Sequence, residues 1–425
     1  MKTTHEQDWA LLVPDAGSWR CVAIGERLVL GRDRTCDVVL SGADIDARHC
    51  RLQVSGGRLS CVDLGSRAGT TLRGQALTAR AMPLTCGDVL RLGRVPVIAV
   101  RSEERHGAAW LQMGDLGSSH PQMRQVLAGL ALAAGADWPL WLAGESGCGK
   151  ELAARLVHTR SARASQAWVA VNCAALHGDT LLAELFGAAR GAYTGCTEAR
   201  RGAFERADGG TLFLDEVAEL TPAAQAALLR VLESGEVQVL GGAVRQVDVR
   251  VLCASHRDLR QEVAAGRFRL DLLHRLSVME VRLPPLRERG DDARILLQEF
   301  LGDLRLPPGA GAVLARHSWG GNVRELRNIA RRLQSCAMWG DPTLPELQAA
   351  IGSGMALASG VADCVAPRPA PAGLPSARSQ DRRQVVASLL GSASSTSEAL
   401  RQSGLPRGTF FRYLKEVRAQ PMQAF

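Results

Sequence analysis

The stretch Gly144-Glu145-Ser146-Gly147-Cys148-Gly149-Lys150-Glu151 decides the fold of the middle of this chain. It follows an apolar run at residues 138–143 and precedes a helix-like segment at residues 152–160. A buried strand, a glycine-rich turn and a helix start form a phosphate cradle, because the glycines let backbone N–H groups point at a phosphate and the helix N-terminus adds positive potential. Lys150, one of three lysines in the chain, would reach the outer phosphates. The alternative, a glycine-rich turn that fits by chance, is disfavoured by the flanking strand and helix.

Length and composition limit what kind of protein this is. A chain of 425 residues is expected to hold two to four domains, and its net charge of +8 permits an anionic partner without naming one. The eleven cysteines are scattered without paired spacing, which favours reduced thiols in the cytoplasm. The first eight residues lack the apolar core of a signal peptide, and the longest apolar run is interrupted by Asp137 and Pro139. We therefore expect a cytoplasmic protein with no membrane segment.

The first hundred residues predict an all-β domain. Short runs of alternating apolar and polar residues, separated by Gly-Gly and Gly-Asp turns, are typical of an antiparallel β-sandwich. Gly31-Arg32, His49 and residues 63–70 resemble the forkhead-associated (FHA) domain, a module that binds phosphothreonine peptides. The resemblance implies an FHA-like regulatory domain over residues 1–100, with Arg32 as a candidate contact of a phosphopeptide. Arg48 is a further candidate, because its charge can compensate that of the nearby Asp46. Residues 101–115 are interpreted as a polar linker.

Two residues depart from the FHA pattern. Asp46 stands where the family has a serine that contacts the phosphate, and Ala68 stands where it has an asparagine that holds the peptide backbone. A carboxylate repels a dianionic phosphate, and alanine cannot supply the lost hydrogen bonds. Two interpretations of this domain therefore stay open. It is either a phosphothreonine-binding domain or an FHA scaffold that serves only for protein contact or regulation.

Two carboxylates provide the second half of a nucleotide site. The apolar run at residues 211–214 ends in Asp215 and Glu216, and such a pair can hold magnesium and orient an attacking water. Placed after a phosphate cradle, with strands and helices alternating between them, the pair predicts an α/β ATPase. We expect its core to extend to about residue 290 and a helical lid to follow.

A loop-like hexapeptide gives the most specific signal in the chain. It reads Gly191-Ala192-Tyr193-Thr194-Gly195-Cys196, and it lies between Glu184-Leu-Phe-Gly and a Trp-Gly-Gly-Asn sequence at residues 319–322. These features resemble the central domain of sigma-54-dependent transcriptional activators, which are AAA+ ATPases, over residues 116–340. In that family the loop contacts the sigma-54 factor and couples ATP hydrolysis to remodelling of the closed promoter complex. Two glycines permit a mobile tip, and an aromatic side chain can anchor on a partner.

The resemblance also assigns roles to single residues. It implies binding of ATP with Mg²⁺ by Gly144, Glu145, Ser146, Gly147, Cys148, Gly149, Lys150, Glu151 and Arg324, the last as second sensor. Asp215 would hold Mg²⁺, and Glu216 would activate water. Asn172 matches the asparagine that restrains this glutamate, and His256 stands where the first sensor is usually asparagine. Arg269 and Arg275 match arginine fingers supplied by a neighbouring subunit, which implies a homo-oligomeric ring, by family analogy a hexamer.

The end of the chain predicts a DNA-binding domain. Residues 341–380 shift to Gly, Ala, Ser and Pro and predict a linker. Residues 381–425 predict three helices with a basic outer face, and residues 404–414 resemble the Fis-type helix-turn-helix. The candidate DNA contacts are Arg407, Thr409, Arg412 and Lys415. A basic amphipathic helix used for oligomer contacts is the alternative.

Together these features predict a multidomain activator: an all-β FHA-like sandwich, an α/β AAA+ ATPase with a helical lid, and an all-α helix-turn-helix. It would bind enhancer DNA and use ATP to open the complex formed by the sigma-54 RNA polymerase holoenzyme. The alternatives are a ring ATPase that remodels another protein assembly, or an FHA adaptor with a vestigial ATPase. The target operon, the DNA site, the activating signal and the sign of N-terminal control stay open.

Overall fold

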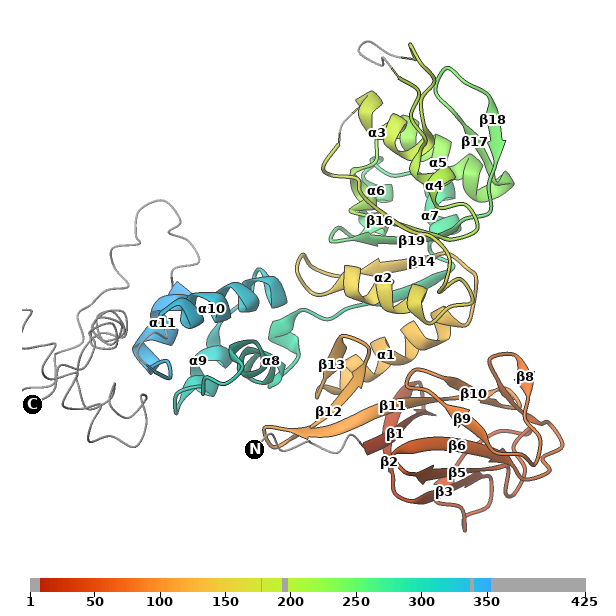
Figure 1. Cartoon of the computed structure of the whole chain (residues 1–425), viewed down its shortest axis with the longest axis vertical. Helices are drawn as coiled ribbons and strands as arrows, with labels where there is room; N and C mark the ends of the chain where they lie inside the picture. Colours follow the sequence, from red (N-terminus) through yellow and green to blue (C-terminus); the bar gives the residue numbers. More distant parts are fainter. Residues whose placement is uncertain (1–7, 177, 193–197, 337–339, 353–425) are drawn as a thin grey trace, which may run out of the picture. The chain divides into compact units, whose positions relative to one another are not determined.

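A computed structural model of the chain describes residues 8–176, 178–192, 198–336 and 340–352 (Figure 1). The described residues fall into two compact units. One holds the chain up to Leu296 together with Leu314–Leu326, and the other holds Leu297–Val313 and the described residues from Arg327 onward. The predicted helix-turn-helix at 381–425 and most of the linker before it lie outside the described residues.

The N-terminal part of the first unit is a sandwich of two β-sheets, as the alternating sequence predicted. One sheet runs in the order β13-β12-β11-β10-β7-β8, with β1 paired to β11 and β2 paired to β1; the other runs β4-β3-β5-β6-β9. The strands are β1 (Asp8–Asp15), β2 (Ser18–Ile24), β3 (Arg27–Gly31), β4 (Val38–Val39), β5 (Cys50–Ser55), β6 (Arg58–Asp63), β7 (Thr70–Leu72), β8 (Gln75–Ala76), β9 (Met82–Leu84), β10 (Val89–Leu92), β11 (Val95–Arg105), β12 (Ala108–Met113) and β13 (Leu116–Ser118).

Successive residues of a strand face opposite sides of the sheet, so each strand turns one set of side chains into the core of the sandwich. β6 alternates buried with partly exposed residues, whereas β1 and β3 are buried on both faces over most of their length. Leu11, Leu30, Leu52, Leu90 and Val97 meet in the core between the two sheets. Between β3 and β5 the chain passes so close to β3 that a Cβ atom at Gly31 would lie 2.2 Å from the carbonyl oxygen of Ala47. Only glycine fits there, and it fixes the position of Arg32 at the end of β3.

The interpretation of residues 101–115 as a linker is wrong, since most of them belong to the sheet. β11 continues to Arg105, and β12 pairs with it antiparallel. Trp110 is buried, the Arg105 guanidinium lies 5.4 Å from its ring centroid, and Arg105 also pairs with Glu103. The charged side chains therefore cover an aromatic residue, and a polar composition concealed a strand.

The second part of the first unit is built on a parallel sheet, as expected for a nucleotide-binding α/β domain. The order is β15-β16-β19-β14-β20, and every described pairing in it is parallel. The strands are β14 (Leu140–Ala143), β15 (Trp168–Asn172), β16 (Thr211–Asp215), β19 (Arg250–Ser255) and β20 (Met279–Arg282). The carboxyl ends of β14, β15, β16 and β19 carry the site described below. A small hairpin, β17 (Glu236–Gln238) with β18 (Val244–Gln246), stands apart from the sheet.

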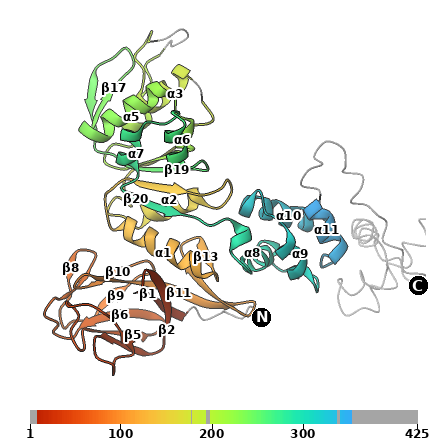
Figure 2. The same ribbon diagram turned by 180° about the vertical axis from the view of Figure 1, so that it is seen from behind.

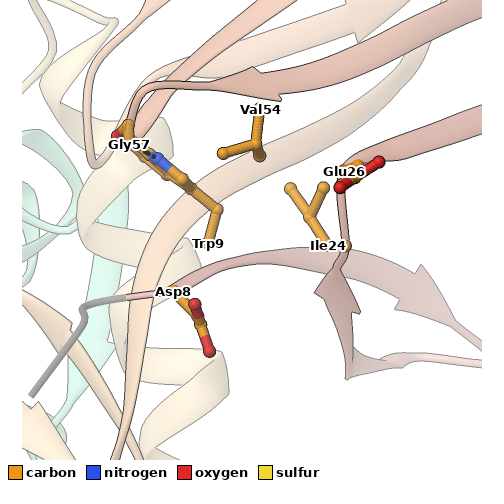
Figure 3. Close-up of a pocket in the computed structure, with 7 residues that line it drawn as sticks. Asp8, Trp9, Ile24, Glu26, Val54 and Gly57 are labelled. Atoms are coloured by element: carbon orange, nitrogen blue, oxygen red, sulfur yellow. Dashed lines mark hydrogen bonds between the residues drawn. The ribbon is translucent and has the colours of Figure 1, made fainter.

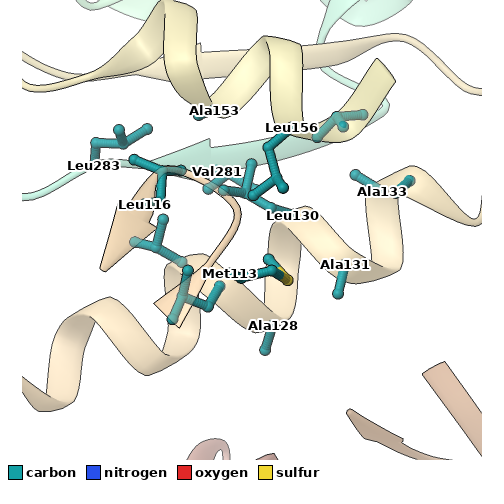
Figure 4. Close-up of a cluster of buried hydrophobic side chains, with 14 of the residues drawn as sticks. Met113, Leu116, Ala128, Leu130, Ala131, Ala133, Ala153, Leu156, Val281 and Leu283 are labelled. Atoms are coloured by element: carbon teal, nitrogen blue, oxygen red, sulfur yellow. The ribbon is translucent and has the colours of Figure 1, made fainter. Parts of the chain in front are cut away.

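Helices cover both faces of this sheet. The helices are α1 (Pro121–Ala134), α2 (Lys150–Thr159), α3 (Gly178–Phe186), α4 (Ala203–Arg206), α5 (Pro222–Ser234), α6 (Leu259–Ala264) and α7 (Leu270–Leu276), with short 3-10 turns η1 (Val217–Glu219) and η2 (Leu286–Glu288). On one face α1 and α2 pack together (Figure 2), and Leu130 and Leu156 meet Val281 of β20 there (Figure 4). On the other face α3, α4, α5 and α7 bury Phe204 and Leu228. This two-sided burial explains why the strands read as continuous apolar runs.

The described part of the second unit is helical. It consists of residues from the last four helices of the described ranges, which are α8 (Asp292–Leu301), α9 (Ala310–Arg316), α10 (Asn322–Cys336) and α11 (Leu344–Gly352). The start of α8, the end of α9 and the start of α10 belong to the first unit. Within the unit the Arg332 guanidinium donates to the carbonyl oxygen of Ala350 at 2.8 Å, and Gln334 donates to that of Phe300 at 2.7 Å. α11 lies inside the stretch predicted as a linker from residue 341, so that prediction is wrong up to residue 352. No helix in the described ranges is long and apolar enough to cross a membrane.

Candidate functional site

The glycine-rich stretch forms a loop between a strand and a helix. β14 ends at Ala143, and α2 begins at Lys150, directly after Gly149, whose φ of 107° is in the left-handed region. A Cβ atom at Gly147 would lie 2.3 Å from the carbonyl oxygen of Gly321, so a side chain there cannot be accommodated. The backbone N–H groups at the start of α2 therefore face the loop, which is the arrangement that binds phosphate oxygens.

Lys150 lies at the centre of this loop. Its side chain is buried, and its Nζ donates to the carbonyl oxygens of Gly144 at 2.8 Å and Glu145 at 3.1 Å. The same Nζ lies 4.0 Å from Oε1 of Glu216. A buried ammonium group between the loop and a carboxylate is placed to contact the outer phosphates of a nucleotide.

Asp215 and Glu216 lie at the carboxyl end of β16, beside the loop. Asp215 stands opposite Asn172 in the register of β15 and β16. Burial raises the pKa of the Asp215 carboxyl group, and the negative charge of Glu216 adds to the effect. Ionising a buried carboxyl group costs free energy, and a neighbouring cation lowers that cost. Mg²⁺ is commonly bound by one carboxylate together with substrate phosphates. The residues present therefore fit a nucleotide that carries Mg²⁺.

Glu216 has an unusual backbone and an unexpected partner. Its φ of 55° is in the left-handed region, which is uncommon for a residue with a side chain. Its Oε2 accepts from Nδ1 of His256 at 2.5 Å and from the backbone N–H of His256 at 3.2 Å. The side-chain oxygen of Asn172 instead accepts the backbone N–H of Ala174 at 2.9 Å. The sequence identified His256 only as a departure from the sensor pattern, and its contact with Glu216 was missed.

The start of α10 packs on the glycine-rich loop. The Arg324 guanidinium donates to Oγ of Ser146 at 3.0 Å, so this predicted residue lies at the loop. The buried Asn322 side chain donates to Oε2 of Glu145 at 3.1 Å and to the carbonyl oxygen of Ser146 at 3.0 Å. Arg287 also binds Glu145, and its hydrogen bond lowers the pKa of that carboxyl group. Asn322 and Arg287 were not predicted, although Asn322 is part of the quoted Trp-Gly-Gly-Asn sequence.

The two predicted arginine fingers lie on the surface around α7. Arg269 precedes α7 and pairs with Asp271 at 2.7 Å, and Arg275 lies 3.6 Å from Glu233. Both arginine side chains are about half exposed. Their described partners are not residues of the glycine-rich loop, so within one chain the fingers and the loop are separate.

The predicted sigma-54 contact loop is described only at its first residues. Gly191 and Ala192 are described, and the backbone N–H of Ala192 donates to the carbonyl oxygen of Ala189 at 3.1 Å. At the base of the loop, Ala188 forms isolated bridges with Arg200 and with Leu240. Tyr193, Thr194, Gly195 and Cys196 lie outside the described residues, as do the predicted DNA contacts Arg407, Thr409, Arg412 and Lys415.

The candidate phosphopeptide residues of the sandwich surround Asp46. The backbone N–H of Arg32 donates to the carbonyl oxygen of Asp46 at 2.9 Å, and the Asp46 carboxylate accepts the backbone N–H of Arg67 at 2.5 Å. Arg32 and Arg48 are exposed. The buried His49 ring accepts from the backbone N–H of Asp46 at 3.2 Å. These residues lie together, and a carboxylate of the protein lies among them.

A pocket of about 460 Å³ opens on the sandwich (Figure 3). It is lined by Asp8, Trp9, Ile24, Gly25, Glu26, Val54 and Gly57. The Trp9 indole N–H donates to the carbonyl oxygen of Gly57 at 3.1 Å and joins β1 to the β5–β6 turn. None of the predicted site residues lines this pocket, so it is separate from the candidate sites above.

A phosphate-binding loop, two carboxylates on the neighbouring strand and helices after the core define an AAA+ nucleotide-binding domain. Comparison with known proteins shows which kind of nucleotide-binding domain this one is similar to. Residues 116–282 match the model of the Sigma-54 interaction domain, and residues 28–93 match the FHA domain. The central part of the chain is thus similar to the Sigma-54 interaction domain, and part of its N-terminal sandwich is similar to the FHA domain.

Three relatives illustrate the similarity. The anaerobic nitric oxide reductase transcription regulator NorR of Citrobacter koseri is 46% identical over 241 residues, which cover 54% of this chain and 48% of NorR. The transcriptional regulatory protein XylR of Pseudomonas putida is 48% identical over 222 residues, which cover 50% and 39%. The chain thus spans about half the length, or less, of these curated relatives. The crystal structure of NtrX from Brucella abortus in complex with ATP is 32% identical, with a TM-score of 0.52, and the match covers 72% of this chain and 69% of NtrX.

Proposed function

We propose that this protein is a sigma-54-dependent transcriptional activator that hydrolyses ATP to open the promoter complex of the sigma-54 RNA polymerase holoenzyme. The observation that carries the proposal is the position of Lys150, 4.0 Å from Glu216, inside a domain that matches the sigma-54 interaction family. The hexapeptide Gly191 to Cys196 supports it, because it lies within the residues 116–282 that match this family. An activator must lie in the compartment that holds its promoter, so the proposal also implies a cytoplasmic location.

The residues of the site have distinct tasks in ATP hydrolysis. The loop N–H groups and Lys150 bind the phosphates, and Ser146 with Arg324 lies at the loop edge. Asp215 would hold Mg²⁺, which supplies positive charge to the β- and γ-phosphate oxygens when bound. Glu216 orients the attacking water and accepts its proton.

The ring arrangement is part of the proposal. Arg269 and Arg275 are half exposed and pair with surface carboxylates in one chain, so each is available to a neighbouring copy. An arginine placed against the transferring phosphate from a second subunit stabilises its developing charge. A closed homo-oligomeric ring, a hexamer by family analogy, brings each pair of arginines to the next site.

The remaining partners follow from the ends of the chain. Residues 381–425 would bind enhancer DNA through Arg407, Thr409, Arg412 and Lys415, and contacts to DNA phosphates make such binding salt-sensitive. The FHA domain provides a protein-contact surface, with phosphothreonine proteins as the class of partner for its fold. The Asp46 carboxylate opposes phosphate binding at this surface.

Transcription in vitro from a sigma-54 promoter tests the proposal. Thr194→Ala is compared with the wild-type chain at matched rates of ATP turnover, and Arg190→Ala, outside the hexapeptide, is the control. We expect Thr194→Ala to hydrolyse ATP without forming open complexes, and Arg190→Ala to behave as wild type. If the wild type hydrolyses ATP but neither binds sigma-54 nor opens such promoters, the alternative of a ring ATPase acting on another protein assembly replaces the proposal.

A further inference from the structure

Both carboxylate oxygens of Glu216 face charged or polar groups of the protein. Oε2 accepts two hydrogen bonds from His256, one from Nδ1 at 2.5 Å and one from the backbone N–H at 3.2 Å. Oε1 lies 4.0 Å from Nζ of Lys150. Because the Glu216 side chain is only 15% exposed, little of the carboxylate is open to water in this arrangement. A glutamate that activates water must have an oxygen free to accept from it.

The backbone holds Glu216 and His256 at neighbouring strand ends. β16 and β19 are adjacent and parallel, and each of the two residues follows the last residue of its strand. The turn around His256 is closed by Ser255, whose Oγ donates to the carbonyl oxygen of Arg257 at 2.8 Å. The Arg257 guanidinium in turn binds Glu219 of η1 at 2.7 Å. The strand-end turns are therefore joined, and the contact between Glu216 and His256 lies between fixed backbones.

We propose that His256 is a positioning residue that holds Glu216 away from the attacking water until the nucleotide site is ready for hydrolysis. The inference rests on the proposed ATPase function and adds a residue that controls its catalytic glutamate. Asn172, which the family resemblance assigns to this task, directs its side-chain oxygen to the backbone N–H of Ala174. His256 makes the bond to Glu216 instead.

The chemistry of the contact defines matched variants. Nδ1 of histidine and the amide nitrogen of asparagine are separated from Cα by the same number of bonds. His256→Asn can therefore keep a hydrogen bond to Glu216, whereas His256→Ala removes the side-chain bond and leaves the backbone one. His274→Ala removes an exposed histidine of α7 and serves as the control.

The first measurement is ATP turnover by the full chain without other proteins or DNA. Loss of one hydrogen bond to a charged group is expected to raise the turnover number of His256→Ala by about tenfold, with the KM for ATP unchanged. His256→Asn and His274→Ala should stay close to wild type. Slower turnover by His256→Ala at unchanged KM would mean that His256 promotes the reaction, and it would overturn the proposal. So would equal effects of His256→Ala and His256→Asn.

The second measurement does not depend on activity. In the nucleotide-free full chain, labelled with ¹⁵N-histidine, the Nδ1 proton of His256 should resonate far downfield, as expected for a short hydrogen bond to a carboxylate. Glu216→Gln should shift this resonance upfield, and His274→Ala should leave it in place. An unchanged resonance in Glu216→Gln would refute the contact itself. If the wild type hydrolyses no ATP, the proposed function fails, and this comparison still decides whether the two residues are bonded.

Discussion

The Asp46 carboxylate accepts the backbone N–H of Arg67 at 2.5 Å, and the Arg67 guanidinium lies 3.7 Å from the same carboxylate. A negatively charged group of the protein thus occupies donors of the loop at residues 63–70, next to the exposed Arg32 and Arg48. Loop N–H groups and arginines are the donors that would bind a phosphate. In this domain the Asp46 carboxylate already lies beside these donors.

Replacing Asp46 by serine should therefore create phosphothreonine binding. The change frees the N–H of Arg67 and removes a charge that repels a dianionic phosphate. Since a hydrogen bond to a charged group contributes about 1.5–3 kcal/mol, we expect at least about tenfold tighter binding than wild type. Calorimetry of the full chain with a phosphothreonine peptide measures it. Asp46→Ser with Arg32→Ala is the control, and a gain that survives this second change would contradict the assignment of Arg32.

Arginine fingers that act between subunits should be separable from Glu216 by mixing. Arg275→Ala alone and Glu216→Gln alone should each lose ATP turnover, the first by about 10³-fold or more. A mixture of the two variants should recover part of the activity, because some subunit pairs then combine an intact Glu216 with an intact Arg275. Two samples of the same variant mixed together provide the control. Mixtures no more active than the parents would place Arg275 outside the neighbouring site.

Asp63 should make the stability of the sandwich depend on pH. Burial opposes ionisation of its carboxyl group, but hydrogen bonds from Thr70, Ser66 and Gly65 outweigh it and lower its pKa. A carboxyl group whose pKa is lower in the folded state adds stability above its unfolded pKa of about 4, and that stability is lost as the pH falls through the folded value. Asp63→Asn should thus unfold more easily than wild type at pH 7.

Thermal unfolding of the two chains across pH measures this effect. The difference in midpoint should shrink as the pH falls below about 4, where the unfolded chain takes up a proton at Asp63 that the folded carboxylate does not yet bind. Asp15→Asn, on an exposed residue at the end of β1, is the control and should follow wild type. A difference between Asp63→Asn and wild type that does not change with pH would indicate a packing effect rather than ionisation.

Asn322 should couple stability to nucleotide affinity. Its side chain accepts the backbone N–H of Leu286 at 2.7 Å and donates to Glu145 and Ser146, while its φ is 51°. Asn322→Ala loses these bonds and places alanine in a left-handed backbone, so we expect a loss of about 2–4 kcal/mol in unfolding free energy and weaker ATP binding.

Asn322→Gly separates the two causes, because glycine tolerates the positive φ but makes no side-chain bonds. Denaturant unfolding and titration with a fluorescent ATP analogue measure both effects. If Asn322→Gly binds the analogue as wild type does, the side-chain bonds to the loop do not shape the nucleotide site.

The sequence predicted the parts of the site that are contiguous along the chain. The loop before Lys150 and the carboxylates after residues 211–214 each combine a buried strand with a turn of fixed residue types, so their local structure follows from local chemistry. The contacts that were missed join distant residues: His256 with Glu216, Asn322 with Glu145, and Asp46 with Arg67. Such pairs depend on which strand ends and loops become neighbours, and no periodicity encodes that.

The two linker predictions failed for a related reason. Residues 101–115 were interpreted as a linker because of their polar composition, and residues 341–352 because they begin a stretch rich in Gly, Ala, Ser and Pro. In β11 and β12, Arg105 covers Trp110 and pairs with Glu103, so the charges are part of a packed strand pair. In α11, Leu347 and Ala350 are buried, and the other residues of the helix are partly or fully exposed. A single buried side chain per turn leaves little trace in composition.

β1 and β11 take part in two hydrophobic cores at once. Leu11 of β1 and Val97 of β11 face the interior of the sandwich, while Leu12 and Ile98, one residue further along each strand, lie in the apolar cluster formed around α1 and α2. Neither strand has a face left for solvent along this stretch. The sheet that contains β1 and β11 therefore packs on both of its faces. The sandwich and the ATPase core should melt in a single cooperative transition. A ligand bound to either one should then raise the melting temperature of both.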